Sequence, residues 1–448
     1  MNRQSKFANR KSQIANRKSM KVFLNSIGCR LNHSEIETLA RQLLANGHEI
    51  VPSAADADHV VINTCAVTAQ ASADARRMTR KIHRANEAAE ITLTGCYATI
   101  SPNELSKIDG VTHVVHNAQK AKLALLLDPQ AKLDIPNFDR EPIMRQFHDG
   151  AVSHTRAFIK VQDGCDNKCT FCVTTVARGA STSRHLGDII SEIQNLHAAG
   201  YHEAVLSGVH LGSYGFEFGN MAGLKELVTS ILEHTDIPRL RLSSLEPWDI
   251  APGFFELWDN PRLLPHLHMP LQSGSAKILK RMARRTKIPQ FRELVTEARQ
   301  NIPNLNITTD IIVGFPGETA DDFRESYDFV EEIGFSRLHA FPYSARPGTA
   351  AADMPDHLTK DQKKARIHEM LELGRKMGSD YHGRFVGKKL NVLWESVHGA
   401  DDKGLRWAGY SNNYIRVQAN GPADLMNTVT AVSVTAADSN GVTATLIQ

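Results

Sequence analysis

The sequence contains no apolar stretch long enough to cross a lipid bilayer, which takes about 20 consecutive apolar residues. Aromatic residues make up only 6% of the 448 residues, and the chain holds only six cysteines. Six cysteines are too few for a disulfide framework in a chain of this length. We therefore expect metal binding in a reducing compartment. The length predicts two or three domains.

The chain also lacks a large excess of one charge, since its formal net charge is +3. Residues 1–21 hold seven Lys and Arg and no acid, so the other 427 residues carry a net charge of −4. A nucleic-acid site must therefore be local. For residues 1–19 the alternatives are a basic RNA-binding arm, an organelle transit peptide and disordered sequence. Because they lack an apolar helix face, we favour a disordered leader or a misassigned start, with Met20 as the natural first residue.

Three cysteines lie on one short stretch in the middle of the chain, with C-x3-C-x2-C spacing. Residues 157–162 predict a strand, so Cys165, Cys169 and Cys172 lie on the loop that follows. Three thiolates suit an iron–sulfur cluster better than zinc, because structural zinc normally takes a fourth ligand. A cubane cluster on three cysteines keeps one iron free for a substrate or cofactor. The alternatives are three structural cysteines and a zinc knuckle with a distant fourth ligand.

The remaining cysteines follow predicted strands of an amino-terminal domain. Residues 20–130 alternate between strand-like and helix-like segments, which predicts an open parallel α/β sheet. Cys29, Cys65 and Cys96 each come just after a strand. Because the carboxyl ends of parallel strands share one edge, where ligands bind, we expect the three thiols to be neighbours. We interpret them as a second cluster site; the alternative is chance burial of free cysteines.

A basic row and a linker complete this part of the chain. The helix predicted from residue 68 carries five cations, at Arg76, Arg77, Arg80, Lys81 and Arg84. Positions 76, 80 and 84 share one face, which is either solvated helix surface or a contact for a phosphate backbone. The sequence leaves both interpretations open.

Residues 131–155 are predicted to be a linker, because this region is rich in proline and shows little periodicity.

The central domain, residues 156–378, is expected to be an incomplete parallel (β/α)6 barrel with its chemistry at the strand carboxyl ends. Polar or glycine residues follow four of its strands: Ser207, Gly208, Ser243, Glu246, Gln272, Asp310 and Gly314. Glycine allows close approach of a ligand, and Ser, Asp or Glu can bind amines, carboxylates or ribose. One cofactor in the barrel mouth, touching the free iron, explains them together. His210 is expected to be a hydrogen-bonded histidine and not a metal ligand.

Residues 381–448 contain five short strand-like runs separated by Gly, Asn and Asp turns. This pattern predicts a small all-β barrel that resembles OB-type nucleic-acid binders. Trp407, Tyr410 and Tyr414 either stack on bases or fill the barrel.

Several of these motifs resemble a known family. Cys165-x3-Cys169-x-Phe171-Cys172 matches the radical SAM signature. Gly28-Cys29, Asn63-Thr-Cys65-Ala-Val-Thr68 and Gly95-Cys96-Tyr97 resemble the amino-terminal domain of the methylthiotransferases. The stretches 207–215, 240–247 and 267–274 are similar to the MtaB branch of that family. The resemblance covers nearly all of residues 20–448. In one departure, Thr175 replaces a proline that members often have, which loosens that loop but removes no ligand.

The resemblance implies a radical SAM methylthiotransferase with two 4Fe-4S clusters, a radical SAM core at residues 156–378 and a TRAM domain at residues 381–448. The cluster on Cys165, Cys169 and Cys172 would bind S-adenosylmethionine, which electron transfer cleaves to a 5′-deoxyadenosyl radical. The cluster on the other three cysteines would carry sulfur that a second S-adenosylmethionine methylates. S-adenosylmethionine is thus both radical source and methyl donor.

The implied substrate is C2 of N6-threonylcarbamoyladenosine at position 37 of tRNA, in the anticodon loop, where a base can be splayed out. An external electron donor, an external sulfur source, a cytoplasmic location and no membrane are implied as well. Sister branches act on isopentenyladenosine in tRNA or on an aspartate of a ribosomal protein. The alternative outside the enzymes is an iron–sulfur RNA-binding module.

Overall fold

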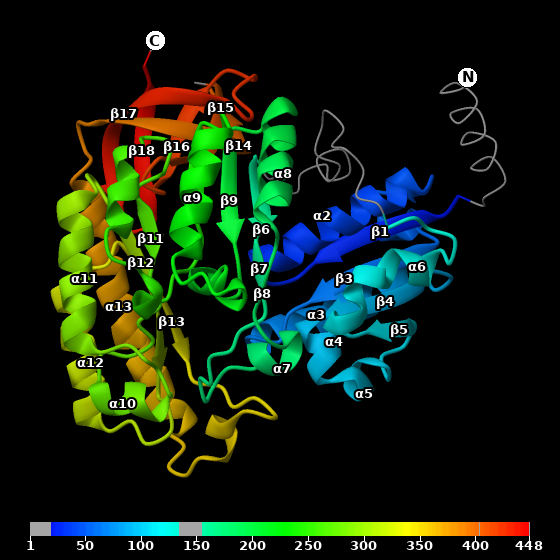
Figure 1. Cartoon of the computed structure of the whole chain (residues 1–448), viewed down its shortest axis with the longest axis horizontal. Helices are drawn as coiled ribbons and strands as arrows, with labels where there is room; N and C mark the ends of the chain where they lie inside the picture. The colour runs from blue at the N-terminus through cyan, green and yellow to red at the C-terminus, as the bar shows by residue number, and fades with distance from the viewer. Residues whose placement is uncertain (1–18, 134–154, 403, 448) are drawn as a thin grey trace. The chain divides into compact units, whose positions relative to one another are not determined.

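The computed structural model describes residues 19–133, 155–402 and 404–447. The chain forms two compact units: the first comprises residues up to 151 with Val176–Arg178, and the second comprises residues 152–175 with 179–448. Figure 1 shows the helices and strands of both. Nearly all of the expected leader and most of the expected linker lie outside the described residues. Among the helices of the described part, none has the length and apolar character to cross a membrane.

The first unit is built on a five-stranded parallel sheet of order β2-β1-β3-β4-β5, which confirms the expected open α/β sheet. Its strands are β1 (Lys21–Ser26), β2 (Glu49–Ile50), β3 (His59–Thr64), β4 (Glu90–Gly95) and β5 (Val111–Val115). Its helices are α2 (Arg30–Ala45), α3 (Ala69–Ala85), α4 (Cys96–Ile100), α5 (Pro102–Leu105) and α6 (Leu123–Leu127). The strand order reverses between β1 and β3, and open α/β sheets bind ligands outside the carboxyl ends at such a point.

Helix α2 is held on the sheet by one apolar stripe. Ile36, Leu39 and Leu43 recur at helical spacing and pack against Val22 and Leu24 of β1. Fully burying one such side chain stabilises the fold by about 1.5–3 kcal/mol. The stripe fixes α2 with its first residue directly after Cys29, which is the N-cap residue.

The core of the second unit is a six-stranded parallel arrangement made of two sheets, β10-β9-β6 and β11-β12-β13. The strands are β6 (Arg156–Lys160), β9 (Glu203–Ser207), β10 (Arg239–Leu242), β11 (His266–His268), β12 (Asn306–Val313) and β13 (Arg337–Pro342). Backbone hydrogen bonds from Leu264 N to Leu240 O (2.8 Å) and from Leu245 N to His268 O (2.9 Å) join the two sheets. The edges are β6 and β13, so this is the expected incomplete barrel.

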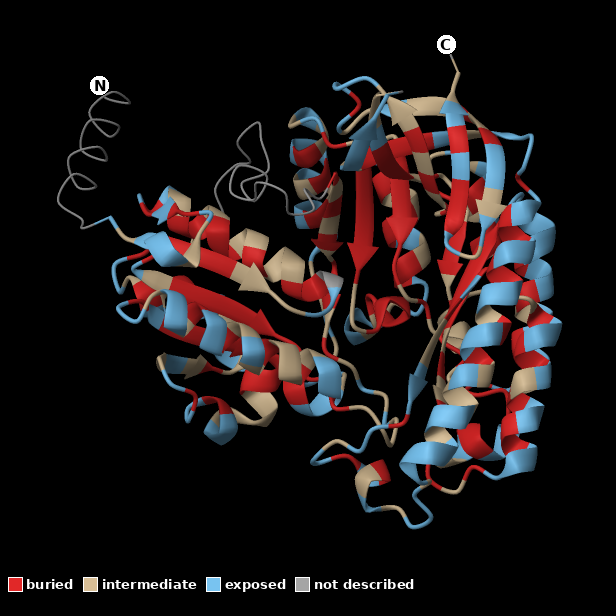
Figure 2. Ribbon diagram, turned by 180° about the vertical axis from the view of Figure 1, so that it is seen from behind, coloured by how far each residue is buried: buried red, intermediate tan, exposed pale blue. Residues whose placement is uncertain are grey.

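Helices alternate with these strands along the chain. They are α8 (Leu186–Ala198), α9 (Gly223–His234), α10 (Ala276–Arg281), α11 (Ile288–Asn301), α12 (Ala320–Ile333) and α13 (Lys360–Gly383). Figure 2 shows that the strands are mostly buried, whereas the outward surfaces of the helices are exposed. A short antiparallel pair, β7 (Gln162–Asp163) with β8 (Thr182–Ser183), and the small helix α7 (Thr174–Arg178) follow β6.

The carboxyl-terminal strands form a closed barrel of order β14-β15-β16-β18-β17, which confirms the all-β expectation. They are β14 (Lys389–Asp401), β15 (Gly404–Ser411), β16 (Arg416–Gly421), β17 (Val429–Asp438) and β18 (Gly441–Leu446). The β16–β18 pair is parallel and the other pairs are antiparallel. Trp394 and Trp407 lie among the apolar side chains that fill this barrel.

Buried charges join this small barrel to the amino ends of the core strands. Glu203, at the start of β9, binds Arg239 at 2.9 Å and Arg241 at 2.7 Å. Arg156, at the start of β6, binds Glu395 of β14 at 2.5 Å. Arg241 Nη1 donates to the carbonyl of Asn412 at 3.2 Å. Each cation thus has a partner, as buried charges require.

The aromatic residues considered as base-stacking candidates serve the protein interior. Trp407 is 2% exposed and its indole nitrogen donates to Pro422 O at 2.8 Å. Tyr410 and Tyr414 stack on each other with ring centroids 4.7 Å apart. The Arg156 guanidinium lies 4.8 Å from the Tyr410 ring, so both tyrosines belong to the contact with the core. Trp407 therefore fills the barrel, as one of the two alternatives has it, whereas Tyr410 and Tyr414 are half-buried and pack against Arg156 of the core.

Candidate functional site

The three cysteines of the first unit lie at the carboxyl edge of three adjacent strands. Cys29 follows β1, Cys65 follows β3, and Cys96 follows β4 as the first residue of α4. Strand β3 pairs with both β1 and β4, so these are neighbouring positions at the point where the strand order reverses. Cys29 is exposed, and Cys65 and Cys96 are buried.

A glycine allows the β1 loop to lie directly on Cys65. Gly28 has φ +119°, a conformation that L side chains rarely adopt. A Cβ atom at this position would lie 2.4 Å from Cys65 Cβ and 3.0 Å from its sulfur. The Gly28-Cys29 pair therefore brings the β1 and β3 loops together.

Polar groups surround the three sulfurs. Val67 N lies 3.4 Å from Cys65 Sγ, Asn117 Nδ2 lies 3.7 Å from Cys96 Sγ, and Cys29 Sγ lies 3.6 Å from Asn32 Oδ1. Burial raises the pKa of Cys65 to about 11. The Cys65 thiol therefore carries its proton until a metal displaces it.

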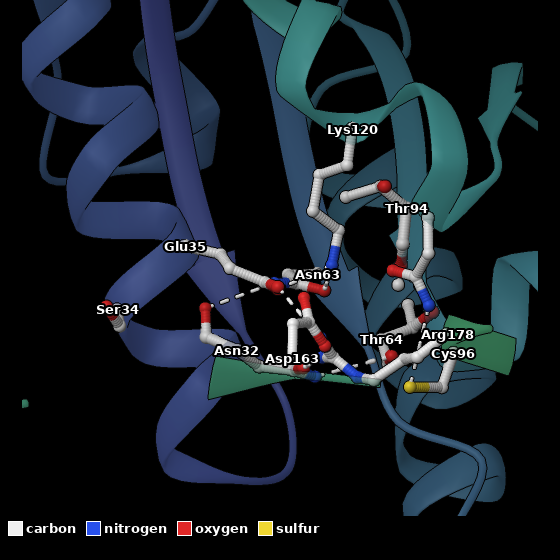
Figure 3. A network of polar contacts seen from close by, with 12 residues as sticks. Asn32, Ser34, Glu35, Asn63, Thr64, Thr94, Cys96, Lys120, Asp163 and Arg178 are labelled. Atoms are coloured by element: carbon white, nitrogen blue, oxygen red, sulfur yellow. Dashed lines mark hydrogen bonds and ion pairs between the residues drawn. The ribbon is translucent and has the colours of Figure 1, made fainter. Parts of the chain in front are cut away.

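A buried polar network lies beside these cysteines (Figure 3). The Glu35 carboxylate binds Lys120 Nζ at 2.5 Å and Arg178 Nη1 at 2.9 Å. Arg178 Nη2 donates to Asn32 Oδ1 at 2.9 Å, and Lys120 Nζ donates to Asn63 Oδ1 at 3.2 Å. Glu35 and Lys120 were not foreseen from the sequence, because no local pattern marks them.

The chemistry of this edge fits an iron–sulfur cluster. No three His, Cys, Asp or Glu side chains of the described ranges are grouped tightly enough to hold a single metal ion. A cubane cluster binds its thiolates through three different irons, so their sulfurs stand farther apart than the ligands of one ion. Thiolates are the usual ligands of such clusters, and N–H groups directed at the sulfurs tune them.

The second set of cysteines lies on the loop between β7 and β8. Gly164 has φ +70°, and a Cβ there would lie 1.8 Å from Ala180 O, so glycine is required. Cys165 N donates to Gly179 O at 3.0 Å and Thr170 N donates to Met282 O at 3.0 Å. These bonds fix both halves of the loop.

Thr175, at the position where a proline was expected, contributes a bond of its own to this loop. Its hydroxyl donates to Asn167 O at 3.3 Å. The loss of a fixed φ is thus partly offset by a hydrogen bond that proline could not make.

Arg284 lies against the loop and was not foreseen from the sequence. Its Nη1 lies 3.7 Å from Cys169 Sγ, and its two terminal nitrogens bind the Glu246 carboxylate. The guanidinium also lies 4.5 Å from the Trp248 ring, at cation–π distance. A fixed positive charge next to a sulfur favours the thiolate that a metal needs.

His210 is hydrogen-bonded, as expected. Its Nε2 forms an ion pair with Asp249 Oδ2, and Asn167 Nδ2 lies 3.4 Å from the ring. Burial alone lowers the pKa of His210, but hydrogen bonds with Asp249 and Cys165 outweigh it and raise the pKa to about 10.

Six of the seven candidate cofactor residues lie at or beyond the carboxyl ends of the core strands. Asp310, which was expected to follow its strand, lies inside β12, because the strand continues to Val313. Three of the seven retain features of a binding site. Ser243 Oγ is buried and has no hydrogen-bond partner among the described residues. Gln272 has φ +72°, a strained conformation that is concentrated at functional sites. Asp310 Oδ2 lies 3.4 Å from His268 Nε2.

The remaining candidates are engaged by the protein itself. Ser207 is fully buried and its hydroxyl donates to Val205 O at 3.3 Å. A Cβ at Gly208 would lie 2.9 Å from Gln162 Oε1. Gly314 N donates to the Glu318 carboxylate. Glu246, described above, faces Arg284.

Two family models match this chain. The model described as "Uncharacterized protein family UPF0004" matches residues 21–116, which contain the first three cysteines. The model of the Radical SAM superfamily matches residues 159–330, which contain the other three. Among solved structures, the radical S-adenosylmethionine methyltransferase TsrM from Kitasatospora setae is similar, with a TM-score of 0.55 and 16% identity. The match covers 75% of this chain and 77% of TsrM, and it concerns the fold alone.

Curated relatives match over most of their length. Threonylcarbamoyladenosine tRNA methylthiotransferase MtaB of Bacillus subtilis (strain 168) is 34% identical over 92% of this chain and 93% of its own. The protein of the same name from Thermotoga maritima is 35% identical over 88% and 90%. A tRNA-2-methylthio-N(6)-dimethylallyladenosine synthase of Thermobifida fusca is 33% identical over 85% and 78%. The chain belongs to the radical SAM methylthiotransferase family, whose enzymes use S-adenosylmethionine and 4Fe-4S clusters.

Proposed function

We propose that this enzyme transfers a methylthio group to C2 of N6-threonylcarbamoyladenosine next to the anticodon of tRNA. The observation that carries the proposal is the 34–35% identity to the Bacillus and Thermotoga enzymes named for this nucleoside, over about nine-tenths of each chain. Both cysteine sets are present along the matched length. Because the substrate is tRNA, the enzyme acts in the cytoplasm.

The two cysteine sets hold the two clusters: Cys29, Cys65 and Cys96 in the first unit, and Cys165, Cys169 and Cys172 in the second. With S-adenosylmethionine, these groups supply the radical chemistry, the sulfur and the methyl group. The residues of the chain bind and orient them. Arg284 places a positive charge at Cys169, and Glu246 holds Arg284 in place. Electrons and sulfur come from external donors.

The S-adenosylmethionine site lies at the carboxyl ends of the core strands. Its residues are those expected from the sequence: Ser207, Gly208, Ser243, Glu246, Gln272, Asp310 and Gly314. Ser243 supports this placement, because an unpartnered buried hydroxyl costs free energy unless a ligand satisfies it.

Helix α3 and the carboxyl-terminal barrel contact the RNA. Arg77, Arg80, Lys81 and Arg84 are exposed and share one face of α3 by the i, i+3 and i+4 rule. Arg76 is less exposed and is paired with Glu104 at 3.0 Å, and the exposed Arg77 is paired with Asp74 at 2.8 Å. Neutralising RNA phosphates with such cations releases counterions, which drives binding. The closed barrel is a TRAM domain, and its outer surface supplies the RNA contact, since its tryptophans are internal.

Nucleoside analysis of a deletion strain tests the substrate. Mass spectrometry of digested tRNA is expected to show loss of the methylthio derivative of N6-threonylcarbamoyladenosine, accumulation of its precursor, and an unchanged methylthio derivative of isopentenyladenosine. The alternative substrate, isopentenyladenosine in tRNA, is supported by the 33% identity to the Thermobifida synthase. Loss of the methylthio derivative of isopentenyladenosine in the deletion strain would establish this alternative instead. If the tRNA nucleosides were unchanged and a ribosomal-protein aspartate lost its modification, the enzyme would belong to the branch that modifies that aspartate.

A reconstituted enzyme separates enzymatic from non-enzymatic roles. Anaerobic loading with iron and sulfide, followed by reduction with S-adenosylmethionine, is expected to yield 5′-deoxyadenosine. An iron–sulfur RNA-binding module would load iron without forming this product.

A further inference from the structure

We propose that a hollow on the outer surface of the carboxyl-terminal barrel binds the RNA backbone, through one phosphate and a neighbouring ribose 2′-hydroxyl. The hollow is lined by residues of β16, β17, β18 and the turn between the last two strands, and its volume is about 300 Å³ (Figure 1). The inference rests on the proposed function, because it takes tRNA as the substrate. Such a site would distinguish RNA from DNA.

The polar side chains of the strands at this hollow face away from the barrel interior. Val417 of β16 and Val442 of β18 belong to the apolar core of the barrel. Because successive side chains of a strand face opposite sides, their neighbours Arg416, Gln418 and Thr443 face outward. All three line the hollow.

These groups are left without partners by the protein. In the described part of the chain, no hydrogen bond or ion pair is formed by the side chains of Arg416, Gln418, Asn440 and Thr443. Arg416 and Gln418 are also half-buried, so each has already lost part of its hydration. A guanidinium and three hydrogen-bonding groups that share one hollow therefore form a set that a polar ligand can satisfy together.

The strand pairing keeps the hollow open. Strands β16 and β18 pair through two residue pairs, one of which sets Gln418 opposite Thr443. Between β17 and β18 the register shifts at Val434 and Ala436. Ala436 and Ala437 line that side, and their methyl groups are too small to fill the space.

The hollow also contains an acceptor, which narrows the class of ligand. Asp438 Oδ1 accepts from Asn440 N at 2.7 Å and from Gly441 N at 3.0 Å, and thereby closes the turn. A free anion would be repelled by this carboxylate. A phosphate that arrives with a 2′-hydroxyl fits better, because the hydroxyl both donates and accepts.

Each part of the RNA backbone then has a partner. Arg416 presents the planar fork of donors that suits a phosphate. Gln418 and Thr443 can donate to the 2′-hydroxyl or accept from it. DNA offers the phosphate alone, so the hydroxyl contacts discriminate between the two nucleic acids, whereas Arg416 binds both.

Filter binding of the reconstituted enzyme at several salt concentrations tests the proposal, with a tRNA transcript and a DNA strand of the same sequence as probes. Arg416→Gln is expected to reduce the salt dependence of the binding constant for both probes by about 0.7–0.9, which corresponds to one phosphate. Thr443→Val and Gln418→Met are expected to keep the slope and to lower the preference for RNA over DNA by about 2- to 10-fold, the effect of one neutral hydrogen bond.

Matched controls remove the same groups from outside the hollow. Arg406→Gln removes an exposed cation of β15, and Thr445→Val removes an exposed hydroxyl of β18. Both are expected to leave the slope and the RNA preference unchanged.

The possible failures are distinguishable. An unchanged slope in Arg416→Gln, or an equal change in Arg406→Gln, overturns this proposal alone, and so does an unchanged RNA preference in Thr443→Val and Gln418→Met. A lower melting temperature of Arg416→Gln than of Arg406→Gln would assign Arg416 to barrel stability and overturn it as well. Failure of the unaltered enzyme to bind the tRNA transcript would instead overturn the proposed function.

Discussion

The Glu246 carboxylate accepts hydrogen bonds from both terminal nitrogens of Arg284, at 3.1 and 2.5 Å. Glu246 follows β10 and Arg284 follows α10, so the pair joins two segments at the carboxyl end of the core. The same guanidinium reaches Cys169 Sγ and donates to Pro270 O at 2.9 Å. A change at Arg284 therefore alters the surroundings of a cysteine and of a proposed cofactor residue together.

Arg284→Lys is expected to lower the rate of S-adenosylmethionine cleavage with little loss of iron. Lysine keeps the charge but lacks the two-pronged geometry of arginine. Losing one charged hydrogen bond costs about 1.5–3 kcal/mol, which is roughly 10- to 100-fold in rate. The measurement is 5′-deoxyadenosine formed on reduction. Arg285→Lys is the control, because Arg285 is exposed and lies 5.8 Å from the Trp248 ring. Equal rates for Arg284→Lys and the unaltered enzyme would contradict this role.

Cys65→Ala is expected to halve the iron of the reconstituted enzyme, from about eight to about four atoms per chain, as two four-iron clusters require. Cleavage of S-adenosylmethionine should persist, because the loop cysteines are untouched, whereas methylthio transfer should stop. Cys169→Ala should also halve the iron, but in this variant both cleavage and methylthio transfer should be lost. If Cys65→Ala also abolished cleavage, the division of labour between the two sites would be wrong.

Glu203→Gln is expected to reduce the free energy of unfolding by about 3–5 kcal/mol, because it leaves two buried arginines without their carboxylate. Chemical denaturation measures the loss. The matched control is Glu332→Gln, which breaks the exposed pair with Arg292 and should leave stability unchanged, since such pairs are screened by water. If both variants lost a similar free energy of unfolding, burial of the Glu203 ion pairs would not contribute to their effect on stability.

The same glutamate predicts a pH dependence. Burial alone raises the pKa of Glu203, but the charges of Arg241 and Arg239 outweigh it and lower the pKa from 4.5 to about 2. A depressed carboxyl pKa adds stability that is fully present above the unfolded value and is lost as pH falls toward the folded one. The stability difference between the unaltered enzyme and Glu203→Gln should therefore narrow between pH 5 and pH 3. If the stability difference stayed constant between pH 5 and pH 3, the pKa of Glu203 would not be lowered in the way stated here.

Removing the exposed cations of α3 is expected to weaken tRNA binding. The quadruple change of Arg77, Arg80, Lys81 and Arg84 to glutamine should reduce the salt dependence of the binding constant by about 0.7–0.9 for each phosphate that is no longer neutralised. Filter binding at several salt concentrations measures the slope. A control with Arg324, Lys364, Arg375 and Lys376 changed to glutamine removes four cations from α12 and α13. Equal slopes for the two variants would mean that only net charge matters.

Sequence patterns predicted the elements that depend on local periodicity. Each cysteine of the first unit was placed after the correct strand, because turns and apolar runs marked β1, β3 and β4. The start of helix α2 could not be read from the sequence pattern: the helix begins at Arg30, directly after Cys29. The polar residues of its first turn conceal the helical period, and packing of the later apolar stripe decides where the helix starts.

Interactions between distant residues could not be read in this way. Glu35 is 85 positions from Lys120 and 143 from Arg178, and neither spacing has a local signature. Tyr410 and Tyr414 looked equally suited to a binding surface and to packing. Their partner Arg156 comes from a strand more than 250 residues earlier, and only the tertiary fold brings it to their rings.

The small closed barrel has a consequence for how its role can be studied. Glu203 and Arg241 are fully buried, and they lie where the core meets β14, β15 and the turn after β15. A truncation before β14 would bring these charges, together with Arg156 and Arg239, into contact with water at the base of the catalytic core. Such a deletion would abolish modification even if the barrel never touched tRNA. Point changes on the outward faces of its strands are therefore the informative experiment.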